Sequence, residues 1–93
     1  MNGALDRLWE LTETPLQHPL SNGQREQLAD DLHLLLSADV AECGAAIRLQ
    51  FVAGGRPSVA YPDAYSSLEA DRMIIRDVRS LIGQVRTPCV ASH

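Results

Sequence analysis

The stretch Ala45–Tyr61, with the sequence AAIRLQFVAGGRPSVAY, decides the fold class of this chain. Its first part alternates apolar and polar side chains: Ile47, Arg48, Leu49, Gln50 and Phe51. This two-residue period is typical of a strand with one apolar face. Gly54 and Gly55 supply a turn, and Val59 and Tyr61 resume the alternation. The pattern therefore predicts a β-hairpin.

The register of this hairpin follows from the length of its loop. A loop of residues 54–56 places Phe51 opposite Val59. The next pair is then Leu49 with Tyr61, so that apolar side chains stay on one face. Because a lone hairpin is marginally stable in water, we expect it to pack against helices.

The preceding segment, Gln24–Cys43, has the clearest helical period in the chain. Its apolar side chains fall within about a third of the helical wheel: Leu28, Ala29, Leu32, Leu35, Leu36 and Cys43. Ser21 is the expected cap, because Gln24 follows it at the capping-box spacing. A continuous helix would bury Asp39 in the apolar stripe, so we expect a break near Ser37.

Two further helices are expected at the two ends of the chain. Residues 4–13 form the first, and it ends before Pro15 because proline disfavours helical geometry at the residue that precedes it. Ser66 and Glu69 have the capping-box spacing and open a helix that extends to about residue 85.

These segments predict an α+β fold in which three helices pack around one hairpin. The alternative continues the central helix to about Ala53 and makes the fold all-α. With 93 residues and 45% apolar content, the chain supports one modest core. We therefore expect a single small domain over residues 1–93, with a mobile tail at 87–93.

The composition also bounds where the protein acts. No apolar run reaches the length of a membrane span, and the N-terminus lacks the features of a signal peptide. Cys43 and Cys89 form neither a disulfide framework nor a zinc pattern, and we expect two reduced thiols. The sequence predicts a cytoplasmic protein that does not bind membranes.

The charge is divided unevenly along the chain. The net charge of −4 argues against non-specific binding of nucleic acid. Residues 1–44 carry eight acids against two arginines, whereas residues 45–93 carry four acids against six arginines. Opposite charge on the two halves suits reciprocal self-association, and we predict a homodimer.

Four arginines line up along one sector of the last helix: Arg72, Arg76, Arg79 and Arg86. Guanidinium groups pair with carboxylates and phosphates, so this edge could bind an acidic partner protein. In a dimer it could meet Asp30 and Asp31 of the other copy. The alternative is a solvated helix face in which Glu69 and Arg72 pair locally.

Two apolar side chains exceed what one small core needs. Leu34 lies on the polar side of the central helix, and Trp9 gives the first helix a second apolar face. Tryptophan is a frequent anchor in protein interfaces. The candidate partner-binding residues are therefore Trp9, Leu34, Arg72, Arg76 and Arg79.

Patterns that would indicate catalysis are weak. Asp30 and His33 have the three-residue spacing of helical metal ligands, but such sites draw ligands from several helices. Residues 54–56 could suggest a phosphate cradle, yet strand-like residues follow instead of a helix. The sequence places no base beside a cysteine or serine nucleophile. We predict no catalytic residues, no metal and no cofactor.

These observations predict a non-enzymatic protein-binding regulator. It would be a homodimer that occludes a surface of a larger protein such as a transcription activator. A structural subunit or chaperone of a secretion or phage assembly is one alternative. A metal-dependent enzyme with a site built across a dimer is another.

Overall fold

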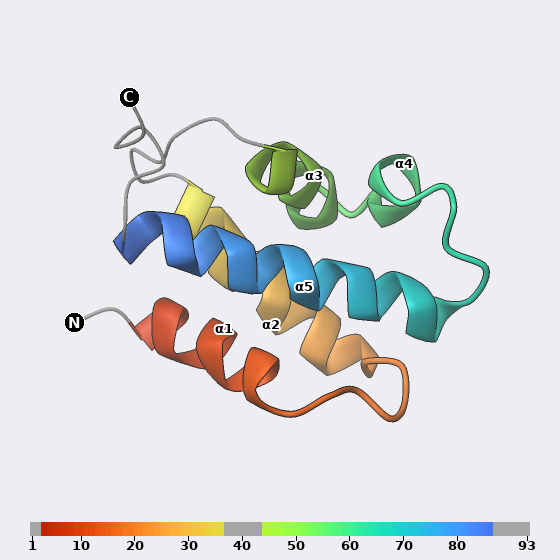
Figure 1. Ribbon diagram of the computed structural model, residues 1–93, viewed down its shortest axis with the longest axis horizontal. Helices are drawn as coiled ribbons and strands as arrows, with labels where there is room; N and C mark the ends of the chain where they lie inside the picture. Colours follow the sequence, from red (N-terminus) through yellow and green to blue (C-terminus); the bar gives the residue numbers. More distant parts are fainter. Residues whose placement is uncertain (1–2, 37–43, 87–93) are drawn as a thin grey trace.

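The structure is a computed structural model that describes residues 3–36 and 44–86. These residues form five helices and no strand (Figure 1): α1 (Gly3–Glu13), α2 (Asn22–Leu36), α3 (Gly44–Ala53), α4 (Pro57–Ala60) and α5 (Ser67–Arg86). The predicted hairpin, and with it the α+β fold, is therefore wrong. The all-α alternative fits, although a separate helix rather than an extension of α2 carries the chain to Ala53.

Small side chains explain why the alternation in residues 47–51 failed as a strand signal. The buried residues of α3 recur at three- and four-residue intervals: Ala45, Ala46, Leu49, Val52 and Ala53. Alanine has the highest helix propensity, and three of these five residues are alanines. Ile47 and Phe51 instead lie on the opposite side of α3 and are 51% and 40% exposed.

The two glycines end a helix instead of joining two strands. The amide of Gly55 donates to the carbonyl of Val52, and the amide of Arg56 donates to the carbonyl of Phe51 at 2.8 Å. Gly55 adopts a φ of 81°. This is the Schellman pattern, in which a left-handed glycine satisfies the last carbonyls of a helix. Pro57 then begins α4, a position that suits its missing amide proton.

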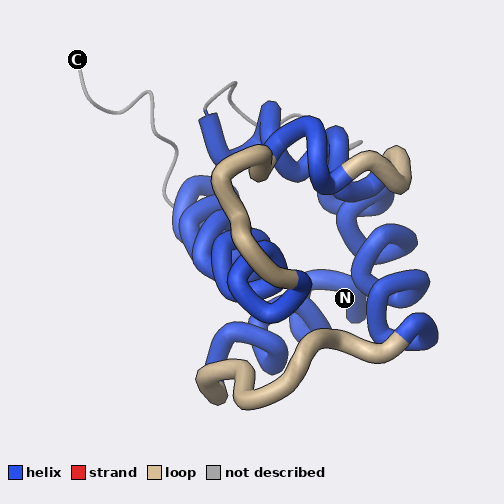
Figure 2. The backbone as a smooth tube through the Cα atoms, turned by 90° about the vertical axis from the view of Figure 1, so that its right-hand side faces the viewer, coloured by secondary structure: helices blue, strands red, loops and turns tan. Residues whose placement is uncertain are grey.

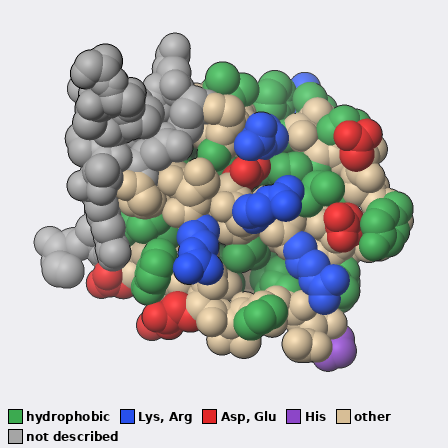
Figure 3. Space-filling view, viewed as in Figure 1, with side chains coloured by type: hydrophobic (Ala, Val, Ile, Leu, Met, Phe, Trp, Pro, Cys, Tyr) green, Lys and Arg blue, Asp and Glu red, His purple; other side chains and the backbone are tan. Residues whose placement is uncertain are grey.

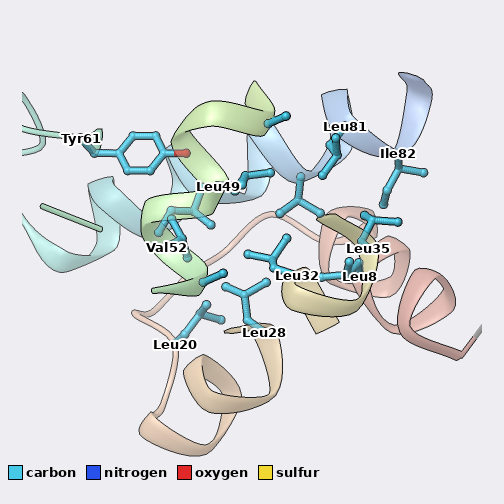
Figure 4. Close-up of a cluster of buried hydrophobic side chains, with 14 residues drawn as sticks. Leu8, Leu20, Leu28, Leu32, Leu35, Leu49, Val52, Tyr61, Leu81 and Ile82 are labelled. Atoms are coloured by element: carbon cyan, nitrogen blue, oxygen red, sulfur yellow. The ribbon is translucent and has the colours of Figure 1, made fainter. Parts of the chain in front are cut away.

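The four longer helices surround a common core. In Figure 1, α5 lies in front of α2, with α1 below and α3 above. Both α1 and α3 pack against α2 and α5, and α4 packs on α3. Leucine and isoleucine side chains from all four longer helices fill the centre (Figure 4): Leu8, Leu32, Leu49, Ile74, Leu81 and Ile82.

The predicted helix starts at Ser21 and Ser66 are confirmed. Ser21 and Gln24 exchange hydrogen bonds between side chain and amide, and the amide of Glu69 donates to Oγ of Ser66. Figure 2 looks at the end of the bundle where α2 and α5 begin. The expected break near Ser37 and the expected tail at 87–93 lie outside the described residues.

None of the described helices is both long and apolar enough to cross a bilayer.

Candidate protein-binding surfaces

Three aspartates are buried between the helices, and an arginine from another helix binds each of them. The guanidinium of Arg7 in α1 lies 2.7 Å from Asp31 in α2. Arg25 in α2 lies 2.8 Å from Asp71 in α5, and Arg48 in α3 lies 2.6 Å from Asp77 in α5. The pairs thus connect three different combinations of helices, and every one of the four longer helices takes part.

Each of these carboxylates also accepts a hydrogen bond from a second group. Asp31 accepts one from the amide group of Gln27, and Asp71 accepts one from the backbone amide of Leu20. The hydroxyl of Tyr61 donates to Asp77. No buried side-chain polar atom of the described residues lacks a partner. Such complete pairing suits a structural role, because a buried charge is stable only when it is compensated.

The group around Asp77 has shifted pKa values. Burial raises the pKa of Asp77, but hydrogen bonds from Arg48 and Tyr61 oppose it, and the resulting pKa is below the usual value. Burial and the hydrogen bond to Asp77 raise the pKa of Tyr61. The hydrogen bond to Asp77 also raises the pKa of Arg48. The cluster therefore holds an ionised carboxylate, a neutral phenol and a charged guanidinium.

The sequence interpretation missed these pairs, although it contained a usable signal. Asp31 was expected on the surface, where it could meet the arginines of a second copy. It is instead buried and bound to Arg7, so it is not exposed for that contact. Asp71 and Asp77 fall beside the apolar face of the predicted last helix. A carboxylate at such a position indicates a buried ion pair, but the sequence does not say which arginine completes it.

The structure places the arginine edge of α5 beside the first part of the chain. The guanidinium of Arg72 donates to the carbonyl of Leu16 at 2.9 Å. Arg79 lies over the ring of Trp9, 5.9 Å from its centroid. Arg76 is exposed and lines a cleft of about 230 Å³ with Arg48 and Asp77. Figure 3 shows basic side chains across the middle of this face, where α5 runs, and acidic ones both at the lower left, where α1 runs, and on the right.

The five candidate partner-binding residues do not form one patch. Trp9, Arg72, Arg76 and Arg79 lie on α1 or α5, and Trp9 and Arg79 are in contact. Leu34 is 62% exposed on α2, one turn beyond Asp31, which faces Arg7. Arg7 faces α2, whereas Trp9 faces α5, so the two residues lie on different sides of α1. Leu34 lies on the α2 side, and it therefore belongs to a different surface from Trp9.

The structure also has a surface that the hairpin interpretation did not predict. We call it the α3–α4 surface, and it consists of exposed residues of α3, of α4 and of the turn that joins them: Ile47, Arg48, Phe51, Arg56 and Val59. Val59 is 54% exposed, similar to Ile47. A hairpin register would have buried these apolar side chains against the helices. In the helical fold they face outward.

Clefts border the α3–α4 surface. An apolar cleft of about 340 Å³ lies between α2 and the turn after α3, and Ala29, Val52 and Pro57 are among its lining residues. A larger cleft of about 640 Å³ opens at the end of the bundle where α2 and α5 begin. Its one arginine, Arg25, already binds Asp71. The described residues contain no group of three His, Cys, Asp or Glu side chains placed to hold a metal ion.

No protein-family model matches this sequence, and no curated protein or solved structure is significantly similar to it.

Proposed function

We propose that this chain is a non-enzymatic protein-binding regulator that covers a surface of a larger protein, such as a transcription activator. The observation that carries the proposal is the exposure of Ile47, Phe51 and Val59 on the α3–α4 surface. The fold does not require large apolar residues there, because the opposite side of α3 already supplies the core. Large apolar side chains gathered at the surface of a small protein mark interaction sites.

The pairing of the buried acids supports a role without catalysis. Asp31, Asp71 and Asp77 each bind an arginine and a second donor. Asp77, whose pKa the hydrogen bonds from Arg48 and Tyr61 hold below its usual value, is a weak proton acceptor. The two cysteines, which we expect to be reduced, suit action in the cytoplasm.

The charged face of α1 and α5 supports the homodimer that forms part of this proposal. Asp6 and Glu10 are exposed on α1, next to the helix that carries exposed Arg72 and Arg76. A face with acids on one helix and arginines on its neighbour is self-complementary under a twofold axis. Ile47, Phe51 and Val59 lie on α3 and α4, outside this face, so such a dimer would leave these three side chains available to the larger protein.

A pull-down from the native host tests the regulator. The tagged chain would be compared with variant I47D, with F51D and with Q50D, which adds an acid on an exposed polar position of α3. We expect one stoichiometric partner that the chain retains in Q50D and loses in I47D and F51D. A partner retained by all three variants would contradict the assignment of the α3–α4 surface. The variant L34D would then test the exposed leucine of α2.

A further inference from the structure

We propose that residues 55–65, which include α4, form a lid that opens while the four longer helices stay folded, and that Tyr61 holds this lid closed. The lid carries Val59, so its opening would move one apolar side chain of the α3–α4 surface away from Ile47 and Phe51 on α3. Only this consequence rests on the proposed function. The motion itself follows from how few contacts hold the lid.

The lid has little contact with the rest of the molecule. Its one buried residue is Tyr61, and no residue of α4 is buried. Among the described helices, α4 packs on α3 and has no comparable contact with α2 or α5. In Figure 1, α4 and the loop that follows it lie at the edge of the bundle. Segments that bury so little apolar surface open at a lower free energy than the core does.

The backbone of the lid is hydrogen-bonded within itself. The amide of Val59 donates to the carbonyl of Arg56, and the amide of Tyr61 donates to the carbonyl of Pro57. These bonds can therefore persist while the lid moves. The lid leaves α3 at Gly55, which has a φ of 81°. Since glycine has no side chain, the backbone can rotate there at little cost.

Clefts surround the lid. Its residues line three of them, with volumes of about 640, 340 and 230 Å³. Pro57 of the lid and Ile74 of α5 line both of the larger clefts, so opening of the lid would join these two clefts. A segment bordered by clefts loses few contacts when it moves, which favours its opening over the loss of a longer helix.

The hydroxyl of Tyr61 supplies the contact that holds the lid. It donates to Asp77 in α5, and within the described residues this is the only hydrogen bond from a side chain of the lid to another helix. Arg48 in α3 binds both oxygens of Asp77, at 2.6 and 2.9 Å, so two helices fix the acceptor. A hydrogen bond to an ionised acceptor is roughly twice as strong as one between neutral groups. Opening breaks this bond, so removal of the hydroxyl should favour the open lid.

Amide hydrogen exchange of the full chain, followed by NMR, tests the lid. In the wild type we expect the amides of Val59 and Tyr61 to exchange faster than those in the middle of α5, because they require only that the lid opens. Low concentrations of urea should speed the exchange of the α5 amides and leave that of the lid amides nearly unchanged, since opening of the lid exposes little surface.

Variants of the chain test the role of Tyr61. Tyr61→Phe keeps the buried ring and should speed the exchange of the Val59 amide by about tenfold. Tyr65→Phe makes the same change at a tyrosine that is 86% exposed, and it should leave this rate unchanged. Ile82→Val removes a methyl group from a fully buried residue of α5. Because Ile82 stays buried when the lid opens, this variant should speed the exchange of the α5 amides several-fold but not that of the Val59 amide.

Two kinds of result would overturn the inference. If I82V speeds the Val59 amide as much as the α5 amides, the segment opens only together with the whole fold. Unchanged exchange in Y61F would contradict the role of Tyr61, and so would a wild-type Val59 amide that exchanges as fast as in an unfolded chain. No partner takes part in these measurements. Failure of the proposed function, shown by a host partner that binds I47D and F51D as well as wild type, would therefore leave the lid standing.

Discussion

At the scale of single residues, the arginines that hold buried aspartates matter more for stability than the arginines along α5. Each buried aspartate is bound by an arginine of a different helix. The sequence could show that Asp71 and Asp77 lie near an apolar face, but not which cation reaches them. Which arginine pairs with which aspartate depends on how the helices cross, and the apolar period of a single helix carries no information on those crossings. The role of Arg48 was therefore missed entirely.

Replacing Arg48 tests the value of one such pair. Arg48→Met leaves Asp77 buried without its cation, and we expect the free energy of unfolding to fall by about 2 kcal/mol. This is below the usual cost for a buried pair, because the side chain of Arg48 is 44% exposed and partly screened. Urea denaturation measures the change. Arg56→Met, at an exposed arginine without an ion pair to another described residue, is the matched control and should change stability little.

The lowered pKa of Asp77 predicts a pH dependence. Because its pKa in the folded state lies below the usual 3.8, the unfolded chain binds the proton more readily. The stabilisation that ionised Asp77 provides is therefore complete at pH values above 3.8, and it is lost as the pH falls through the pKa that Asp77 has in the folded state. We expect the unfolding free energy of the wild type to fall more steeply below about pH 4 than that of D77N. Equal slopes in wild type and D77N would contradict the assignment.

At the scale of elements, three of the four longer helices could be predicted, and α3 could not. The segments that became α1, α2 and α5 have long apolar periods, and their ends carry proline or capping residues. The segment of α3 is short, and its alanines contribute little to an apolar pattern although they form most of its buried side. The exposure of Ile47 and Phe51 follows from this helix. The α3–α4 surface was accordingly beyond prediction from the sequence.

Truncation of two neighbouring apolar residues distinguishes the helix from the hairpin. Leu49 is fully buried and Ile47 is half exposed, so we expect Leu49→Ala to cost about 3 kcal/mol. Ile47→Ala should cost well under half as much, because much of its side chain is already in water. In a hairpin both residues would share the buried face and cost similar amounts. Equal losses in urea denaturation would therefore contradict the helical assignment.

The turn after α3 offers an independent check on the same element. Gly55 has a φ of 81°, which side chains disfavour, and Gly55→Ala should destabilise the fold by about 1 kcal/mol. At Gly54, an added methyl group would meet the carbonyl of Gln50 at 3.5 Å, an ordinary contact. We therefore expect Gly54→Ala to be the milder change in thermal unfolding. The reverse order would argue against this helix end.

At the scale of the whole molecule, the structure shows which acids of the acidic first half are exposed and which are buried. The acids of the first half are not all available, since Asp31 is inside and bound to Arg7. Those exposed on α1 include Asp6 and Glu10, and α1 packs against the helix of Arg76, although Glu10 also lines a cleft with Gln24 of α2. The sequence could therefore predict that charge is asymmetric, but not which acids face the solvent beside the arginines.

Charge reversal tests the homodimer, because a twofold interface repeats each contact. We expect R76E alone, or D6R together with E10R, to raise the dissociation constant of the dimer by about tenfold or more. In an equal mixture of the two variants, the new basic side chains at positions 6 and 10 of one copy would face the new acidic side chain at position 76 of the other copy. The unreversed groups would face each other in the same way, so the mixed dimer should regain wild-type affinity.

Sedimentation velocity at low salt measures all of these species. Arg76 is the arginine to change, because Arg72 donates to Leu16 and Arg79 lies over Trp9, whereas Arg76 acts within the described chain through its charge near Asp77. Glu26→Arg, at an exposed acid of α2, is the control and should leave the dimer intact. A wild-type chain that stays monomeric would remove the homodimer from the proposed function. A dimer that all these variants retain would place its interface away from the charged face of α1 and α5.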